Sequence, residues 1–324
     1  MGKLDINDWI KKLPVNKKKS KTNAPQIGLE MTPNAISAVQ LTPQKDRPTL
    51  NFNQLFYGTD VAERIRCLKE FIEPQLPKKY QCNMVLHPSY YRLLLVDAPD
   101  LPDDAPPDEL KETMKWRIKD LISEPIDKVV LDIISLPKDA YEGRMNMVYV
   151  AVAPIQQIDA FLEGLNNFGL APNSIDIPEM TASTLCLKID DSRPFACIGI
   201  REQGSFVNVI TESQLYLTRN VDISLDTLHS IADGEEHASE QLLSEVQRSM
   251  DYYESQLGKG QIEQIIFLPA ASRGCHATLE LLTENLDPPV FGMDLSQIIE
   301  AETELSVPEQ AHALPAIGAA MRGL

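Results

Sequence analysis

The apolar positions of the chain repeat with two different periods, and segments of the two kinds alternate along most of its length. Alternating or contiguous apolar residues between turn residues predict β-strands, at residues 27–31, 35–41, 84–86, 91–96, 129–134, 147–153, 195–200, 206–211, 214–219 and 262–268. Apolar spacings of three and four residues predict helices, at residues 63–71, 109–122, 155–168, 239–257, 276–285 and 314–321. This alternation of strands and helices indicates an α/β fold class.

Turn residues between the strands predict how they pair. Residues 32–34 read Thr-Pro-Asn, so the strands on either side of them are expected to form a β-hairpin. The strands at 84–86 and 91–96 are expected to form a second pair, and the three strands within 195–219 a meander. Both halves of the chain are therefore expected to begin with an antiparallel sheet.

Turn residues and proline-rich segments also predict the domain organisation. The acidic, proline-rich run at 98–108 indicates a subdomain boundary. We expect a basic tail at residues 1–24 and a first lobe at 25–190, with a small α/β insertion at about 97–170. A second lobe is expected at 191–324.

Composition limits the class of protein. With 324 residues, 43% apolar and 24% charged, the chain resembles ordinary soluble globular proteins. No apolar run approaches the roughly 18 residues that span a bilayer, and no apolar secretory signal is present, so we expect a cytoplasmic protein. The five cysteines are scattered without the short spacings of zinc sites, and the five histidines have no metal-ligand spacing, so packing or surface roles are expected for both.

Charge separates the tail from the rest of the chain. Residues 1–24 contain seven lysines and two aspartates, a net charge of +5, so the other 300 residues have a net charge of about −22. So acidic a body is not expected to bind nucleic acid. In the tail, Ile6, Trp9, Ile10 and Leu13 lie on one side of a helical wheel before Pro14. Two interpretations stay open: contact with anionic lipid or a partner, and a solvated tail.

Several strings of residues are informative through their order along the chain. They are Ile27 to Glu30 with Ala38 to Leu41, Leu95 to Glu109, Trp116 to Leu121, Ile175 to Glu179, Glu245 to Tyr253 and Ala316 to Gly323. Together they resemble the PilM and MshI proteins of type IV pilus machines, which have an actin-like fold. The resemblance covers about residues 25–324.

The resemblance implies a fold and a role. The fold is an actin-like (ribonuclease H-like) pair of lobes, with the insertion in the first lobe. The role is that of a cytoplasmic assembly protein, peripheral to the inner membrane, that binds the cytoplasmic N-terminal peptide of an inner-membrane PilN-like protein. MshI in particular implies the mannose-sensitive haemagglutinin (MSHA) pilus. Homo-oligomerisation stays open, and the cytoplasmic part of a GspL protein of type II secretion is an alternative with the same fold.

Actin-like ATPases hold phosphates and magnesium with glycines and carboxylates at three places, and this chain departs from the pattern at each. In the first loop, which follows Gly28, Glu30 replaces the usual aspartate, and Thr32 begins a string with a proline in place of Gly-Ser or Gly-Thr. In the second lobe the resemblance places the Asp-x-Gly string at Gly199 and Arg201.

The third departure is at the adenosine loop, where Ala270 and Ala271 replace a pair of glycines. We therefore expect a degenerate nucleotide site, no ATPase activity and no required cofactor, with residual ATP or ADP with Mg²⁺ left open. An active ATPase is the alternative. Glu30 is interpreted as a solvated hairpin residue, with a magnesium ligand as the alternative. Arg201 is interpreted as a loop cation paired with Glu202 or another acidic neighbour, or as the mimic of a bound cation.

The insertion offers residues for the partner peptide. A peptide with apolar and basic residues needs an apolar channel with acidic flanks. Trp116, Ile118, Val129 and Leu131 are the candidates for that channel, next to the acidic run from Asp97. For Trp116 a place in the core is the alternative.

Overall fold

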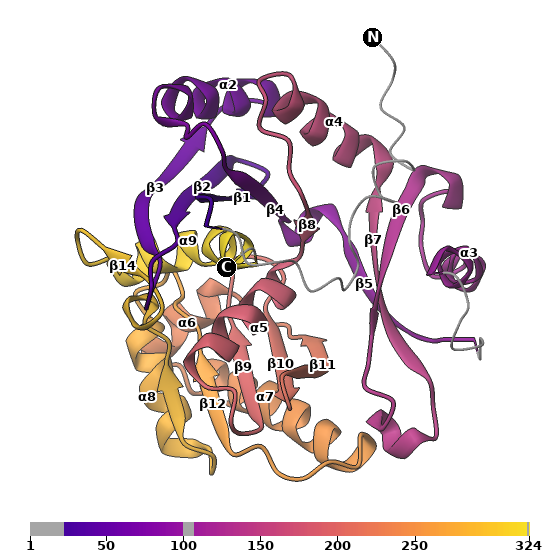
Figure 1. Ribbon diagram of the computed structural model, residues 1–324. Coiled ribbons are helices and arrows are strands. Elements are labelled where there is room, and N and C mark those ends of the chain that lie inside the picture. The colour runs from indigo at the N-terminus through magenta and orange to yellow at the C-terminus, as the bar shows by residue number, and fades with distance from the viewer. Residues whose placement is uncertain (1–22, 100–106, 323) are drawn as a thin grey trace.

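Three β-sheets and the helices around them form the protein (Figure 1). The computed structural model describes residues 23–99, 107–322 and 324, so the interpretation of the tail at 1–24 lies almost entirely outside the described residues. In the described residues, short 3-10 turns link the larger elements at Glu73–Gln75, Pro88–Tyr90, Ile126–Lys128 and Leu295–Gln297, and an irregular turn with positive φ at Tyr141 and Glu142 lies at Ala140–Gly143.

The first lobe is built on a six-stranded sheet. Its strands lie in the order β14-β3-β2-β1-β4-β8, with β8 at one edge. Their bounds are β1 Gln26–Met31, β2 Ala35–Thr42, β3 Thr49–Tyr57, β4 Gln81–Leu86, β8 Ile175–Asp176 and β14 Glu300–Ala301. Helices α2 (Val61–Ile72) and α4 (Ile155–Asn166) cover the outer face, where they pack on Ile27, Leu29 and Met31. Because side chains alternate along a strand, Gly28 and Glu30 point to the other face.

The second lobe is built on a five-stranded sheet in the order β11-β10-β9-β12-β13. Its outer face packs against three helices. The strands are β9 Phe195–Gly199, β10 Phe206–Thr211, β11 Gln214–Asn220, β12 Gln264–Phe267 and β13 Val290–Gly292; the helices are α6 Leu225–Ala232, α7 Glu236–Gln256 and α8 Cys275–Asn285.

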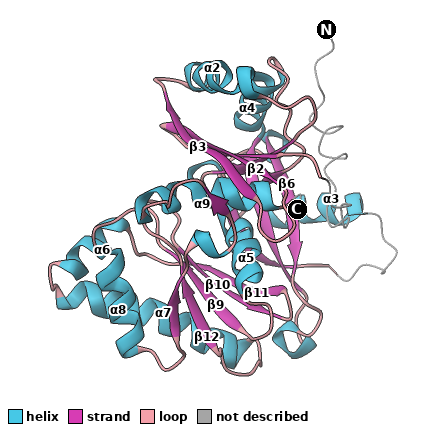
Figure 2. Ribbon diagram, turned by 60° about the vertical axis from the view of Figure 1, so that its left-hand side comes forward, coloured by secondary structure: helices cyan, strands magenta, loops and turns pink. Residues whose placement is uncertain are grey.

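Two helices lie between the sheets and join the lobes (Figure 2). Helix α5 (Pro178–Ile189) leads from the first lobe into the second, and α9 (Val307–Met321) returns to pack against β1 and β2. A single apolar core therefore runs from the inner face of one sheet, through these helices, to the inner face of the other.

The insertion is a three-stranded antiparallel sheet in the order β5-β7-β6, covered by α3 on one face. Its elements are β5 Arg92–Asp97, α3 Pro107–Ile118, β6 Val129–Ser135 and β7 Met147–Pro154. The turn between β6 and β7 reaches the second lobe, where Ala140 and Tyr141 are buried in that lobe's core. The insertion therefore contacts both lobes, as Figure 1 shows at its right-hand side.

Most of the predicted elements are present, and one predicted pairing is wrong. The hairpin β1–β2 and the meander β9–β10–β11 are confirmed. The strands predicted at 84–86 and 91–96 do not pair with each other: β4 pairs with β1 and β8, and β5 pairs with β7 of the insertion. The 3-10 turn between them redirects the chain, so β5 leaves the first sheet instead of turning back along it.

Other differences concern the bounds of the predicted units. Helix α3 ends at Ile118, four residues before the predicted end, and α4 packs on the first lobe and not within the insertion. Helices α5 and α6 and strand β3 were not predicted as such. The division at 190/191 stays a prediction, and the structure adds that β14 and α9 pack against the first sheet. In the described part of the chain, no helix is long and apolar enough to span a membrane.

Candidate functional site

A polar cleft opens between the two lobes, where the resemblance predicts a nucleotide. It has a volume of about 320 Å³ and is lined from both sides. Of the predicted nucleotide-site residues, Glu30, Thr32, Arg201 and Ala271 line this interlobe cleft. The structure thus brings together side chains that lie up to 241 positions apart in the sequence, from Glu30 to Ala271.

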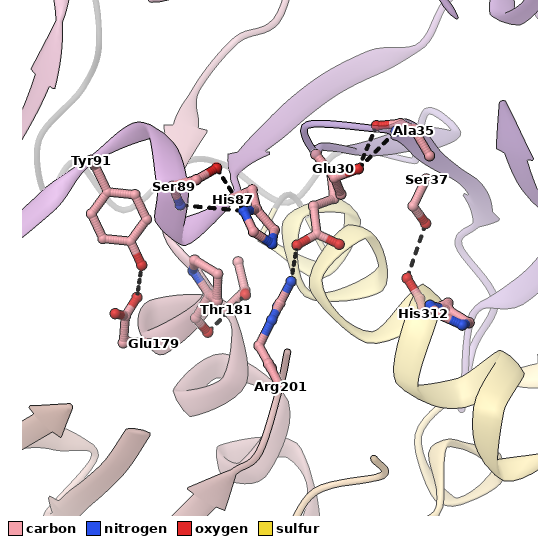
Figure 3. A network of polar contacts seen from close by, with 12 residues as sticks. Glu30, Ala35, Ser37, His87, Ser89, Tyr91, Glu179, Thr181, Arg201 and His312 are labelled. Carbon is pink, nitrogen blue, oxygen red and sulfur yellow. Dashed lines mark hydrogen bonds and ion pairs between the residues drawn. The ribbon is translucent and has the colours of Figure 1, made fainter. Parts of the chain in front are cut away.

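An ion pair between Glu30 and Arg201 closes the centre of the cleft (Figure 3). An Nη of Arg201, which follows β9, donates to Oε1 of Glu30 on β1. The side chain of Glu30 is only 4% exposed and that of Arg201 is 21% exposed. The interpretation of Glu30 as a solvated hairpin residue is wrong, because its strand turns it toward the other lobe and not toward solvent. The acidic partner of Arg201 is Glu30 and not the adjacent Glu202.

The loop after β1 uses most of its backbone amides on itself. The Thr32 N–H donates to the Ala35 carbonyl at 3.0 Å, and the Ala35 N–H donates to Thr32 Oγ1 at 2.9 Å. Pro33 has no N–H. Arg64, which is buried, donates from Nη1 to the carbonyls of Thr32 and Pro33. Among the described residues, the Asn34 amide is then the one N–H of residues 32–35 without a hydrogen bond, which is a poor set of donors for a phosphate.

Two of the predicted glycines are needed for packing and do not line the cleft. A Cβ on Gly28 would lie 1.8 Å from the carbonyl oxygen of Ala316 in α9. A Cβ on Gly199 would lie 2.6 Å from the ring of Phe206 on the next strand. Ala270 is 1% exposed and belongs to the core of the second lobe. These three positions therefore keep the sheet and helices in close contact, whatever the cleft binds.

Three further side chains, not predicted as site residues, lie beside the ion pair. Burial and the nearby Arg201 cation lower the pKa of His87 to about 4, so its ring is neutral at pH 7 and its Nδ1 accepts the Ser89 N–H at 3.3 Å. The Tyr91 hydroxyl donates to Oε2 of Glu179 at 2.5 Å (Figure 3). Burial raises the pKa of Glu179, although the Tyr91 hydrogen bond and Arg201 act in the opposite direction.

The sequence contained only a faint signal for these residues. Glu179 ends the Ile175 to Glu179 string that resembles the family's crossover. His87 lay in the turn between two predicted strands and Tyr91 began the second of them, with no site role predicted for either. Among the described residues, no group of three or more histidines, cysteines, aspartates or glutamates could hold a metal ion.

A second site lies between the insertion and the lobes. Two adjoining cavities share Asp132, Ala151 and residues 175–177, and we call the two together the edge groove. The larger cavity has a volume of about 440 Å³ and the smaller about 90 Å³. Strand β6 forms one wall and β8 the other, and each is the last strand of its sheet in the described structure. The edge groove therefore runs between two sheet edges with unpaired backbone groups, a suitable place for an extended peptide.

The smaller cavity of the edge groove has mainly apolar walls, whereas the larger one also has polar side chains, among them Ser174 and Thr184. Val130, Ala151, Ile175 and Ile177 supply apolar surface. The further lining residues Asp132 and Asp176 each have a cationic partner: Lys111 Nζ lies 2.8 Å from Asp132 Oδ1, and Arg322 of the α9 end pairs with Asp176. Burial raises the pKa of Asp176, against the effect of Arg322.

The four predicted partner-binding residues do not lie together. Leu131 lines the edge groove. Ile118 and Val129 are buried in the core between α3 and the insertion sheet, so they do not reach it. Trp116 is 71% exposed on the outer side of α3, with Lys119 Nζ 5.7 Å from its ring centre. The sequence left the partner groove and the core open for Trp116, and both are wrong, because the residue lies on the surface.

Comparison with known proteins supports the fold. No family model and no curated protein matches the chain. A solved structure of a PilM-PilN type IV pilus biogenesis complex matches with a TM-score of 0.70 and 20% identity, over 94% of this chain and 99% of that chain. The chain has the actin-like fold that the resemblance implies. The expected two-lobed fold and the resemblance to PilM are thereby confirmed at the level of the fold.

Two more distant structures are also similar. One is a Bacteroides thetaiotaomicron protein with an actin-like ATPase fold and unknown function, with a TM-score of 0.49 and 12% identity over 90% of this chain and 96% of that chain. The other is the cytoplasmic domain of EpsL, an inner membrane component of the Vibrio cholerae type II secretion system. It has a TM-score of 0.45 and 11% identity, over 90% of this chain and 95% of that chain.

Proposed function

We propose that this protein is a cytoplasmic platform component of a type IV pilus, at the inner membrane, and that its edge groove holds an extended cytoplasmic segment of a PilN-like protein. The observation that supports this most is the full-length similarity to a chain of the PilM-PilN complex. The string Trp116 to Leu121, which resembles MshI, favours an MSHA-type pilus.

The chemistry of the edge groove fits such a segment. Unpaired strand edges can bind the backbone of an extended peptide, and apolar walls can bind alternate side chains. Asp132, whose side chain is 52% exposed, offers a carboxylate to a basic residue of the peptide. Lys111 would give up or share this carboxylate when the peptide binds.

We further infer that the interlobe cleft does not support ATP hydrolysis. Glu30, the carboxylate at the expected magnesium position, already neutralises Arg201. The loop at residues 32–35 leaves a single amide for phosphate oxygens among the described residues. The ion pair holds the two lobes together at the place where a bound nucleotide and metal would otherwise do so.

The partner proposal is tested with labelled synthetic peptides from the cytoplasmic N-termini of candidate PilN-like proteins. Fluorescence anisotropy should detect binding of at least one peptide to the native chain. Ala151→Arg should weaken that binding by at least tenfold, because Ala151 lies opposite Asp132 in the β6–β7 register and a long side chain there fills the edge groove. Ala160→Arg, on the exposed side of α4, is the matched control and should not change the affinity. Equal affinities for the two variants would exclude the edge groove.

The nucleotide proposal is tested by phosphate release and by thermal unfolding. With Mg²⁺ and millimolar ATP, the native chain should release no phosphate above background. Thermal unfolding distinguishes an empty cleft from a nucleotide bound without turnover, because a ligand raises the melting temperature only when it binds. Turnover that disappears in Glu30→Gln would contradict the proposal and support the active ATPase.

A further inference from the structure

We propose that residues 1–22 of this chain bind in the edge groove and compete there with the partner. The inference rests on the proposed function only in that the edge groove is also the partner's site. Three observations support it: where the described chain begins, what the edge groove offers, and the composition of residues 1–22.

The described chain enters the first sheet close to the edge groove. The Gln81 N–H at the start of β4 donates to the Pro25 carbonyl at 3.0 Å, and β4 is the strand next to β8. The start of β1 is thus two strand spacings, about 10 Å, from the strand that forms one wall of the edge groove. The end of α9 lies on the same side, because Gly28 packs on Ala316 and Arg322 lines the larger cavity.

The connecting residues are long enough to reach the edge groove. Residues 14–25 can span up to about 40 Å when extended, several times the distance across two strands. Residues 6–13, which contain Ile6, Trp9, Ile10 and Leu13, can therefore reach either cavity without any change in the described fold.

The chemistry of the segment matches that of the edge groove. Ile6, Trp9, Ile10 and Leu13 are apolar side chains for apolar walls, and the seven lysines are cations for a strongly acidic body. Asp132 is the exposed carboxylate at the centre of the edge groove. A PilN-like peptide with apolar and basic residues presents the same chemistry, so the two segments would exclude each other.

The tether makes even weak binding effective. A segment tethered to its own binding site has an effective concentration of about 1 mM. If the free segment had a Kd of about 100 µM, it would occupy the edge groove about ten times out of eleven and weaken partner binding about tenfold. Release of the segment, by another ligand or by the partner itself, would then control access to the platform.

The test uses a fluorescein-labelled synthetic peptide of residues 1–22 and the full-length chain. A triple variant, Trp9→Ser/Ile10→Ser/Leu13→Ser, should bind this peptide at least tenfold more tightly than the native chain, because its own segment no longer competes. Adding Ala151→Arg to the triple variant should abolish the binding. The matched control is Trp116→Ser/Leu121→Ser, which removes exposed apolar side chains from α3 and from the turn after it and should behave as the native chain does.

Three results would overturn the inference. In the first, the 1–22 peptide binds the native chain and the triple variant with equal affinity. In the second, adding Ala151→Arg to the triple variant does not change the binding. In the third, the peptide binds phosphatidylglycerol vesicles but not the triple variant. Failure of the proposed function gives a different pattern. If PilN-like peptides bind the native chain and the triple variant equally, only the competition is excluded; if the 1–22 peptide binds and no PilN-like peptide does, only the partner proposal is excluded.

Discussion

The ion pair across the interlobe cleft predicts an asymmetric response to substitution. Arg201→Met leaves the Glu30 carboxylate in a place where its side chain is only 4% exposed. Stranding one charge of a buried pair costs about 3–5 kcal/mol of the free energy of unfolding. Glu30→Gln leaves the Arg201 guanidinium, which is 21% exposed and borders a cavity of about 320 Å³. That cation can turn into the cavity, so the expected cost is lower, about 1–2 kcal/mol.

A double-mutant cycle measures the coupling between the two side chains. Urea unfolding followed by circular dichroism gives the free energy of unfolding for the native chain, both single variants and Glu30→Gln/Arg201→Met. The double variant should cost less than the sum of the singles by about 1–3 kcal/mol. The control is Arg47→Met, which removes a surface pair with Glu300 whose side chains are 44% and 50% exposed, and should cost less than about 1 kcal/mol. Additive costs for Glu30 and Arg201 would refute an ion pair that holds the lobes together.

Three further predictions concern single positions. Gly28→Ala should lower the free energy of unfolding by about 1–3 kcal/mol, because its Cβ would meet the α9 backbone, whereas Gly260→Ala, with no atom within 4 Å, should change it by less than about 0.5 kcal/mol. Similar values for the two variants would contradict the close packing of α9. Trp116→Ala should lower the free energy of unfolding by less than about 1 kcal/mol and Ile118→Ala by about 2–5 kcal/mol in the same urea assay, since Trp116 is exposed and Ile118 is buried. A larger loss for Trp116→Ala than for Ile118→Ala would place Trp116 in the core. Because burial raises the pKa of Glu179, the folded chain retains a proton that the unfolded chain releases near pH 4.5, so the free energy of unfolding falls as pH rises above that value. Glu179→Gln should remove this part of the fall between pH 4.5 and 7.5; a difference in the free energy of unfolding between native chain and variant that does not change with pH would contradict this.

Local patterns in the sequence were sufficient to predict most of the elements. The hairpin around residues 32–34 and the meander at 195–219 follow from alternating apolar residues and turn residues between them, and both are present. Helix α7 follows from its apolar face. The pairing of β5 with β7 could not be predicted from local patterns, because it joins residues 50 to 60 positions apart. A 3-10 turn of three residues determines which sheet the strand joins.

The candidate site shows the same division between local and distant information. The sequence identified Glu30 and Arg201 as unusual residues, but their ion pair depends on how the two lobes meet. It assigned Gly28 and Gly199 to a nucleotide loop, although what these glycines contact is a helix and a phenylalanine ring. Trp116 differs for a simpler reason: it lies on the opposite side of α3 from Ile118, which is buried, and helical spacing alone did not show which side faces the sheet.

The proposed platform role depends on where the partner segment binds, and photocrosslinking tests this directly. A photoreactive amino acid at position 132, at the centre of the edge groove, should crosslink a labelled PilN-like peptide to the full-length chain. The same amino acid at position 160, on the exposed side of α4, should give no crosslink, and excess unlabelled peptide should suppress the crosslink at 132. Crosslinking at 160 that equals or exceeds crosslinking at 132 would contradict binding in the edge groove.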